Sequence, residues 1–244
     1  MNKVFCRKKR ILPSFFTGFL ILFNLFLFSA CGLDTFFVIN APTEIIHEPT
    51  YQNTIDEADR YFEFRTNENQ DDSVIFLGTD VYYKIYSDSS RLTSEHSSIM
   101  QLANSDNSSN QAADRMIASY RFQPLRAKGH TDQVVLVPNK NSNRRVKIRL
   151  VDIRPYDVAQ ISISDSIVDI PVRALPNSPS FDFFSGADDM KPKSDDADTN
   201  MSSSSTDPDV YYVSMFAVAV GQDNTYARLY SNVLYLGSVQ ISRN

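Results

Sequence analysis

The residues that could carry catalysis or hold a metal are few in this chain, and most of them lie far apart. The three histidines, His47, His96 and His130, do not have the spacing of a metal site, which needs several converging donors. The sequence contains neither a Gly-x-Ser-x-Gly segment nor a glycine-rich phosphate-binding loop. Paired carboxylates such as Asp71 and Asp72 are too common to indicate acid–base catalysis. We therefore predict no catalytic residue, no metal and no cofactor.

A run of basic residues stands out in an otherwise acidic protein, on a hairpin that we predict over residues 134–150. On such a hairpin the run would form a positive strip that could bind phosphate or sulfated sugars. The alternative is a solvent-facing strand whose charges protect its edge from aggregation or pair with the acidic loop that we predict over residues 185–209. The predicted ligand contacts in this run are Lys140, Arg144, Arg145, Lys147 and Arg149.

A cysteine that follows an apolar segment is the other chemical signal. Residues 1–10 are basic, residues 11–28 are apolar, and the small residues Ser29 and Ala30 precede Cys31. A basic region, an apolar region and a small-residue cleavage site, in that order, are typical of a secretory signal peptide. The alternative is an uncleaved transmembrane anchor, because the apolar segment nearly spans a bilayer, although a proline, a glycine and an asparagine interrupt it.

The segment Phe28-Ser29-Ala30-Cys31 resembles the lipobox of bacterial lipoproteins, although Phe28 replaces the usual aliphatic residue. In that family the cysteine thiol receives a diacylglyceryl group, the signal peptide is removed, and the new amino group is acylated. The resemblance implies a lipoprotein of the bacterial cell envelope, anchored in the lipid bilayer through acylated Cys31. Some family members carry an aspartate after the cysteine that retains them in the inner membrane. Gly32 stands there and favours the outer membrane, on its periplasmic or surface face.

The net charge of the mature chain limits its partners, and its cysteine content limits how it can be stabilised. The whole chain has a net charge of −5, and removal of residues 1–30, which carry five bases and no acid, leaves −10. Such an acidic protein is repelled by nucleic acid, so we predict no nucleic-acid partner. Cys31 is then the only cysteine, which leaves no disulfide within the mature chain and requires a domain stabilised by burial.

Alternating apolar residues predict a mainly β fold. Val81, Tyr83 and Ile85 alternate with Tyr82, Lys84 and Tyr86, and further short strands are predicted at 158–163 and 167–173. The many tyrosines could form an aromatic contact surface, although ordinary cross-strand packing explains them as well.

The C-terminal segment resembles the last two strands of fibronectin type III domains. Tyr211, Val213, Met215 and Ala217 follow the alternation of that family, in which the tyrosine hydroxyl bonds to nearby backbone, and residues 81–86 resemble its third strand. The usual tryptophan of the second strand is missing, because the chain contains none. The resemblance implies an immunoglobulin or fibronectin type III-like antiparallel β-sandwich.

The predicted organisation has three parts: a signal peptide at 1–30, an N-terminal tether and first strand at 31–57, and a β-sandwich domain at 58–244. Apolar residues at helical spacing predict a helical insertion at about 92–122. Residues 185–209 contain seven aspartates and two lysines with almost no apolar side chains, which predicts a disordered acidic loop.

Three functions remain open at this stage. The favoured one is a non-enzymatic interaction module, held at the membrane, that binds a protein or a glycan. The second is a structural subunit of an envelope assembly complex, and the third and least favoured is a hydrolase with an unrecognised site. Sandwich folds host many functions, so the fold alone does not choose among them.

Overall fold

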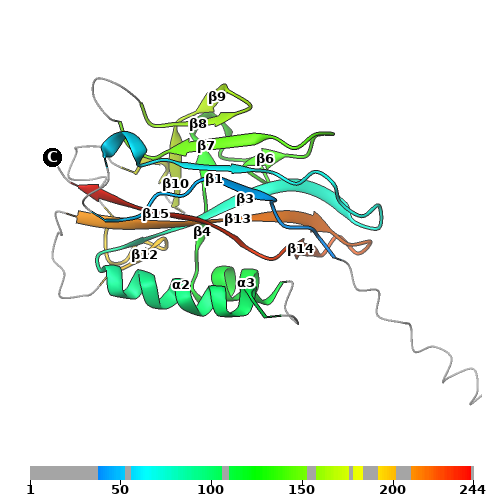
Figure 1. The fold of residues 1–244 in the computed structure, drawn as a ribbon, viewed down its shortest axis with the longest axis horizontal. Coiled ribbons are helices and arrows are strands. Elements are labelled where there is room, and N and C mark those ends of the chain that lie inside the picture. Colours follow the sequence, from blue (N-terminus) through cyan, green and yellow to red (C-terminus); the bar gives the residue numbers. More distant parts are fainter. Residues whose placement is uncertain are drawn as a thin grey trace, which may run out of the picture. The chain divides into compact units, whose positions relative to one another are not determined.

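The computed structural model describes residues 38–52, 56–105, 110–152, 158–175, 178–183, 192–201 and 210–242. The segments that carry the predicted signal peptide and Cys31 lie outside the described residues. The described part of the chain is mainly β, with antiparallel sheets stacked as in a sandwich and a helical layer on one side (Figure 1). This confirms the mainly β prediction.

One sheet is built from five described strands in the order β1-β2-β7-β8-β9. All of its neighbours are antiparallel. The bounds of its strands are β1 Glu44–His47, β2 Phe62–Arg65, β7 Arg145–Arg149, β8 Gln160–Ile163 and β9 Ser166–Asp169. The turn between β8 and β9 places Ser164 and Asp165 at φ 50° and 64°, the left-handed conformation that a two-residue hairpin turn requires.

The second large sheet is built on the long central strands β3, Ile75–Tyr86, and β13, Val210–Gln222. β13 pairs with β3 on one side and with β15, Leu234–Ser242, and β14, Arg228–Tyr230, on the other. Short strands extend β3: β4, Gln123–Pro124, and β6, Val137–Pro138, are antiparallel to it. β12, Thr199–Asn200, is parallel to β3, which departs from the purely antiparallel prediction.

A smaller sheet has the order β11-β10-β5, with β5 at Arg126–Ala127, β10 at Pro171–Leu175 and β11 at Ser178–Asp182. Two short 3-10 turns, η1 at Glu57–Asp59 and η3 at Lys128–His130, connect strands.

The core between the two large sheets explains the sequence alternation. Val213, Met215 and Ala217 of β13 face this core together with Phe62 and Phe64 of β2. Their neighbours Phe216 and Val218 point to the opposite side of β13, toward the helices. Because both faces of β13 are covered, the strand is an almost continuous apolar run.

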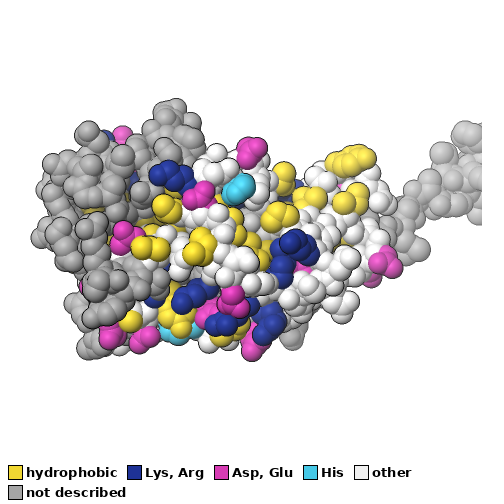
Figure 2. All heavy atoms as spheres, turned by 90° about the horizontal axis from the view of Figure 1, so that it is seen from above, with side chains coloured by type: hydrophobic (Ala, Val, Ile, Leu, Met, Phe, Trp, Pro, Cys, Tyr) yellow, Lys and Arg dark blue, Asp and Glu magenta, His cyan; other side chains and the backbone are white. Residues whose placement is uncertain are grey.

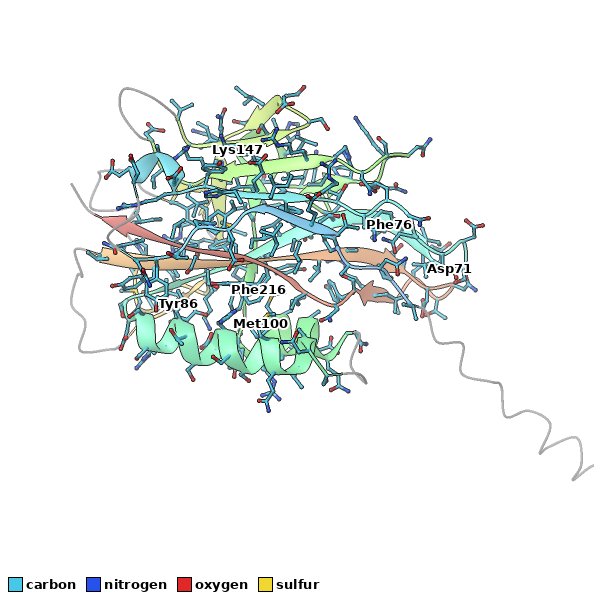
Figure 3. All side chains as sticks on the ribbon, viewed as in Figure 1. Asp71, Phe76, Tyr86, Met100, Lys147 and Phe216 are labelled. Carbon is cyan, nitrogen blue, oxygen red and sulfur yellow. The ribbon has the colours of Figure 1, made fainter. Side chains whose placement is uncertain are left out.

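The predicted helical insertion is confirmed in outline. Helix α2, Ser89–Ala103, begins after Asp88, whose side chain accepts a hydrogen bond from the Ser90 amide at 2.7 Å. The α-helix α3, Gln111–Asp114, continues into the π-helix η2, Arg115–Ser119. In Figure 3, Met100 of α2 lies across from Phe216 of β13, and both belong to the cluster between helices and sheet.

The predicted hairpin over residues 134–150 is wrong, because its two halves belong to different sheets. β6 pairs with β3, whereas β7 pairs with β2 and β8. Gly78 has a φ of 138°, and a Cβ at this position would collide with the Val137 carbonyl, so a glycine lets β6 lie against β3. The Asn139 amide then donates to the Leu77 carbonyl at 2.9 Å, which keeps the chain on β3 before it crosses to β7.

The prediction of disorder over residues 185–209 is wrong for residues 192–201. These residues contain turns and β12, and Asp198 is fully buried. The remainder of the predicted loop lies outside the described residues.

Candidate ligand cavity

The structure divides the predicted basic strip into two groups. Val146 and Ile148 of β7 face the core, so Arg145, Lys147 and Arg149 lie on the outer face of the five-stranded sheet. The other two predicted contacts, Lys140 and Arg144, precede β7 and line a cavity.

Neighbouring residues contact each of the three basic side chains on the outer face. Arg145 pairs with Glu63, and the Lys147 ammonium lies 4.2 Å from the centre of the Tyr61 ring. Arg149 is buried and donates to the backbone carbonyls of Glu57 and Ala58 at 3.2 and 2.7 Å. In Figure 2 basic and acidic side chains are interspersed on the face seen from above, and Figure 3 shows Lys147 on the five-stranded sheet. Among the described residues, the carboxylate nearest Arg145 belongs to the neighbouring strand β2 rather than to the predicted acidic loop.

The first cavity, called cavity 1 below, has a volume of about 410 Å³, within the range of small-ligand sites. Its walls come from the β6 region, from the turn before β7, and from β8 and β9. Two of its described lining residues are basic, three are polar and uncharged, four are aliphatic, and none is acidic or aromatic: Gln133, Leu136, Pro138, Lys140, Arg144, Ile163, Ser164, Ser166 and Val168.

Hydrogen bonds to Glu68 and to the Pro138 carbonyl hold Arg144 in place. Its exposed fraction is 7%, and its Nη2 donates to Glu68 Oε1 at 3.0 Å and to the Pro138 carbonyl. Glu68 is fixed in turn, because Thr66 Oγ1 donates to its Oε1 at 3.0 Å and the Lys140 amide to its Oε2 at 3.1 Å. The guanidinium is thereby oriented by a buried carboxylate.

Arg144 has one more hydrogen-bond donor, its Nε. Its Nε is buried and has no hydrogen-bond partner within the described ranges. A buried donor without a partner costs about 1–3 kcal/mol, and because Nε is shielded from solvent, it does not face the open space of cavity 1. The Lys140 side chain is exposed beside it, so cavity 1 combines an oriented guanidinium, a free-standing ammonium and the hydroxyls of Ser164 and Ser166.

A second cavity, called cavity 2 below, has a volume of about 340 Å³ and carries charges of both signs. It lies between β3, α2, the η2 end and the 192–201 segment. Its lining includes Lys84 and Arg121 as well as Glu95, Asp195 and Asp196.

The central charges at cavity 2, Lys84 and Glu95, are paired. Lys84 Nζ donates to Glu95 Oε2 at 3.1 Å and to the Tyr120 carbonyl. Glu95 also accepts from the Tyr86 hydroxyl at 2.8 Å and from the Asn200 amide at 2.6 Å. Burial lowers the pKa of Lys84, and the Glu95 carboxylate opposes that shift.

A buried ion pair lies next to cavity 2. Arg173 donates through Nε and Nη2 to both carboxylate oxygens of Asp198, at 2.7 and 2.6 Å, and through Nη2 to Asp196 at 2.6 Å. Tyr83 donates to Asp198 at 2.7 Å, and burial raises the tyrosine pKa well above its ordinary value. These bonds hold the 192–201 segment against the sandwich.

A third buried pair lies inside the domain, where Arg126 donates to both oxygens of Asp80 at 2.8 and 3.3 Å. The Leu136 amide donates to Asp80 Oδ1 at 3.0 Å, which ties the chain before β6 to β3. Sequence analysis missed all three pairs. The available signal was a charged residue inside an otherwise apolar strand, as at Asp80, Lys84 and Arg173.

The histidines are separated in the structure as they are in the sequence. The His47 ring stacks on Tyr61 with centroids 3.9 Å apart, and its Nδ1 lies 2.8 Å from the Tyr61 carbonyl. His96 packs 4.1 Å from the Tyr235 ring, and burial lowers its pKa. No group of three or more histidine, cysteine or acidic side chains that could hold a metal occurs in the described ranges.

Comparison of the chain with protein-family models, with curated protein sequences and with solved structures finds no match. In the described part of the chain, no helix has the length and apolar character needed to cross a membrane.

Proposed function

We propose that this protein is a lipid-anchored, non-enzymatic interaction module of the bacterial cell envelope, and that it binds a protein or a glycan in cavity 1. The observation that carries the binding function is the composition of that cavity. An oriented, buried Arg144 and an exposed Lys140 share a space of about 410 Å³ with aliphatic walls, and no acidic side chain is among the described lining residues. In a protein whose mature net charge is −10, such a site selects an anionic group by local contacts rather than by overall attraction.

The anchor is proposed from the sequence of the leader. A basic region, an apolar region and Phe28-Ser29-Ala30-Cys31 support acylation of Cys31. Each buried methylene contributes about 0.8 kcal/mol, so two or three acyl chains hold a protein at a bilayer where a single chain does not. The proposed place is the outer membrane, on its periplasmic or surface face, because Gly32 follows the cysteine.

We also propose that the sandwich is of the fibronectin type III kind. In immunoglobulin-like sandwiches the third strand and the last two strands share one sheet. Here β3, β13 and β15 are neighbours in that order, and Tyr211, Val213, Met215 and Ala217 all face the core. An experimental structure with a different strand connectivity would contradict this proposal.

The anchor is tested by expressing the full chain and Cys31→Ser in bacteria and separating membranes from soluble material. We expect the wild-type chain in the membrane fraction, with a mature N-terminus at an acylated Cys31 in mass spectra, and the variant to be neither acylated nor cleaved at that position. A wild-type N-terminus upstream of residue 31, or one without acyl mass, contradicts the anchor.

The interaction function is tested by crosslinking in intact cells and by a hydrolase substrate panel on the purified protein. Crosslinks that are lost on substitution of cavity 1 residues support it. A fixed stoichiometric envelope partner whose crosslinks ignore cavity 1 would instead favour a structural subunit of an assembly complex. Robust turnover of a substrate would overturn the non-enzymatic proposal.

A further inference from the structure

We infer that cavity 1 binds the C-terminal carboxylate of an extended peptide whose last side chain is aliphatic, with the peptide backbone lying along the edge of β9. This inference rests on the proposed binding function of cavity 1 and specifies its ligand. Three features of the described residues carry it: the charge balance at Arg144, the composition of the walls, and the position of β9.

The charge balance fits a singly charged anion. Glu68 neutralises one positive charge by its ion pair with Arg144 at 3.0 Å, while Lys140 uses its backbone amide, not its ammonium, to bind Glu68. One positive charge in excess remains, and the exposed Lys140 carries it. A carboxylate supplies one negative charge and two acceptor oxygens, whereas a phosphate group carries up to two charges at neutral pH.

The walls of cavity 1 fit an aliphatic side chain. Leu136, Pro138, Ile163 and Val168 provide apolar surface next to the cations, and no aromatic ring is among the described lining residues. Sugar rings are commonly held against the flat faces of aromatic side chains, so an aliphatic wall favours a peptide over a glycan. An aliphatic side chain buried against these walls strengthens binding by removing apolar surface from water.

β9 provides an edge for the peptide backbone. It is the last strand in the order β1-β2-β7-β8-β9, and among the described strands it pairs only with β8 (Figure 1). Ser166 and Val168 of β9 line the cavity, while Ile167 between them is not a lining residue and has an exposed fraction of 68%. An added strand on a sheet edge gains main-chain hydrogen bonds, and pockets beside it bind alternate side chains.

The test uses the full acylated protein in detergent micelles and a fluorescent tetrapeptide, Ala-Ala-Ala-Leu, with either a free C-terminal carboxylate or a C-terminal amide. We expect the acid to bind about 10–100-fold more tightly than the amide, since charge-assisted hydrogen bonds to a charged group contribute about 1.5–3 kcal/mol. Equal binding of acid and amide, or no binding of either, would overturn the inference.

Two adjacent residues of β9 supply a matched pair of variants. Ser166→Tyr places a ring into cavity 1 from an exposed position, and Ile167→Tyr places the same ring on the opposite face of the strand. We expect the first to abolish peptide binding and the second to change it less than about threefold. Thermal unfolding of both variants verifies that the fold is retained, and similar losses in both would contradict the inference.

A glycan is the competing ligand, and an oligosaccharide of hexuronic acid is its probe. One outcome would be that the oligosaccharide binds, that Ser166→Tyr abolishes this binding, and that the peptide acid does not bind. In that case the peptide inference fails while the proposed interaction function stands. If Cys31 is not acylated but the peptide acid binds as expected, the anchor fails while the ligand assignment stands. The two failures are therefore distinguishable.

Discussion

Cavity 1 and cavity 2 differ less in volume, about 410 and 340 Å³, than in the way their charged groups are satisfied. At cavity 2, Lys84 is paired with Glu95, and both are further bonded by neighbouring side chains and backbone. At cavity 1, Arg144 has one carboxylate partner, and Lys140 is exposed and makes no ion pair among those of the described residues. Paired charges stabilise the fold around them, whereas an exposed charge without a partner can bind a ligand. The same residue types therefore have different roles because their partners differ.

The largest expected effect is on the paired side of this comparison, at Asp198. Asp198→Ala leaves the buried Arg173 guanidinium without its main partner, and removal of one member of a buried pair costs about 3–5 kcal/mol. Asp195→Ala, at an exposed position in the same segment, should change the free energy of unfolding by less than about 0.5 kcal/mol. Denaturant unfolding of both variants measures the difference. Equal effects would show that the 192–201 segment is not held by this ion pair.

A smaller loss of stability is expected when Glu95 is replaced. This residue is the centre of the charge network of cavity 2. Glu95→Leu should destabilise the fold by about 2–3 kcal/mol, because it leaves the Lys84 ammonium without its carboxylate partner and the Tyr86 hydroxyl without its acceptor. Combining it with Lys84→Met should restore much of that stability, since an apolar pair can replace a buried ion pair. Peptide binding in cavity 1 should be unchanged in the double variant, and a loss of binding would mean that cavity 2 is not independent of cavity 1.

The parts of the fold that could be predicted from the sequence are those governed by local periodicity. Tyr211, Val213, Met215 and Ala217 face the core as predicted, because side chains of a strand alternate between its two faces. The helical insertion was predictable for the same reason, since Ala112, Ala113 and Met116 recur at helical spacing and are buried.

Pairings between distant residues were beyond local periodicity. The turn residues 138–143 predicted a hairpin, yet β6 lies on β3 because Gly78, about sixty residues earlier, leaves room for it. Composition averaged over residues 185–209 predicted disorder, whereas Asp198 is ordered by Arg173 and Tyr83. At the site, Lys140 and Arg144 were predicted as ligand contacts, but the start of β7 at Arg145 separates them from the outer-face residues. That boundary depends on tertiary pairing with β2.

Alkaline pH should destabilise the fold in part through two tyrosines of the paired side. Tyr83 and Tyr86 donate to Asp198 and Glu95, and burial together with these carboxylates raises the pKa of both hydroxyls above the ordinary value of 10.0. Above pH 10 the unfolded chain loses these protons while the folded chain keeps them, so stability is full below pH 10 and falls as pH rises. Each such tyrosine contributes a loss of about 1.4 kcal/mol per pH unit.

Lys84 has the opposite effect on the pH dependence of stability, and it acts at lower pH. Its pKa is lowered from 10.5, so it increases stability with rising pH only up to that value, and above it Lys84 no longer contributes to the slope. Unfolding midpoints between pH 10.5 and 11.5, with tyrosinate absorbance on the folded protein, measure this slope. Tyr86→Phe should reduce it by the contribution of one tyrosine. An unchanged slope would mean that Tyr86 ionises equally in the folded and unfolded states.

The smallest effect on stability is expected at Lys140, on the unpaired side. Its ammonium is exposed and makes no ion pair among those of the described residues, so Lys140→Gln should change the free energy of unfolding by less than about 0.5 kcal/mol. Its backbone amide, which binds Glu68, is retained, and Arg144 therefore stays oriented. Binding of the peptide acid should nevertheless weaken about threefold to tenfold and become less sensitive to salt, because one charge of the site is lost. Lys193→Gln, at an exposed position of the segment beside cavity 2, is the matched control and should leave both quantities unchanged. A loss of stability at Lys140 without a loss of binding would reverse the roles assigned to the two cavities, since cavity 1 would then be the one whose charges stabilise the fold.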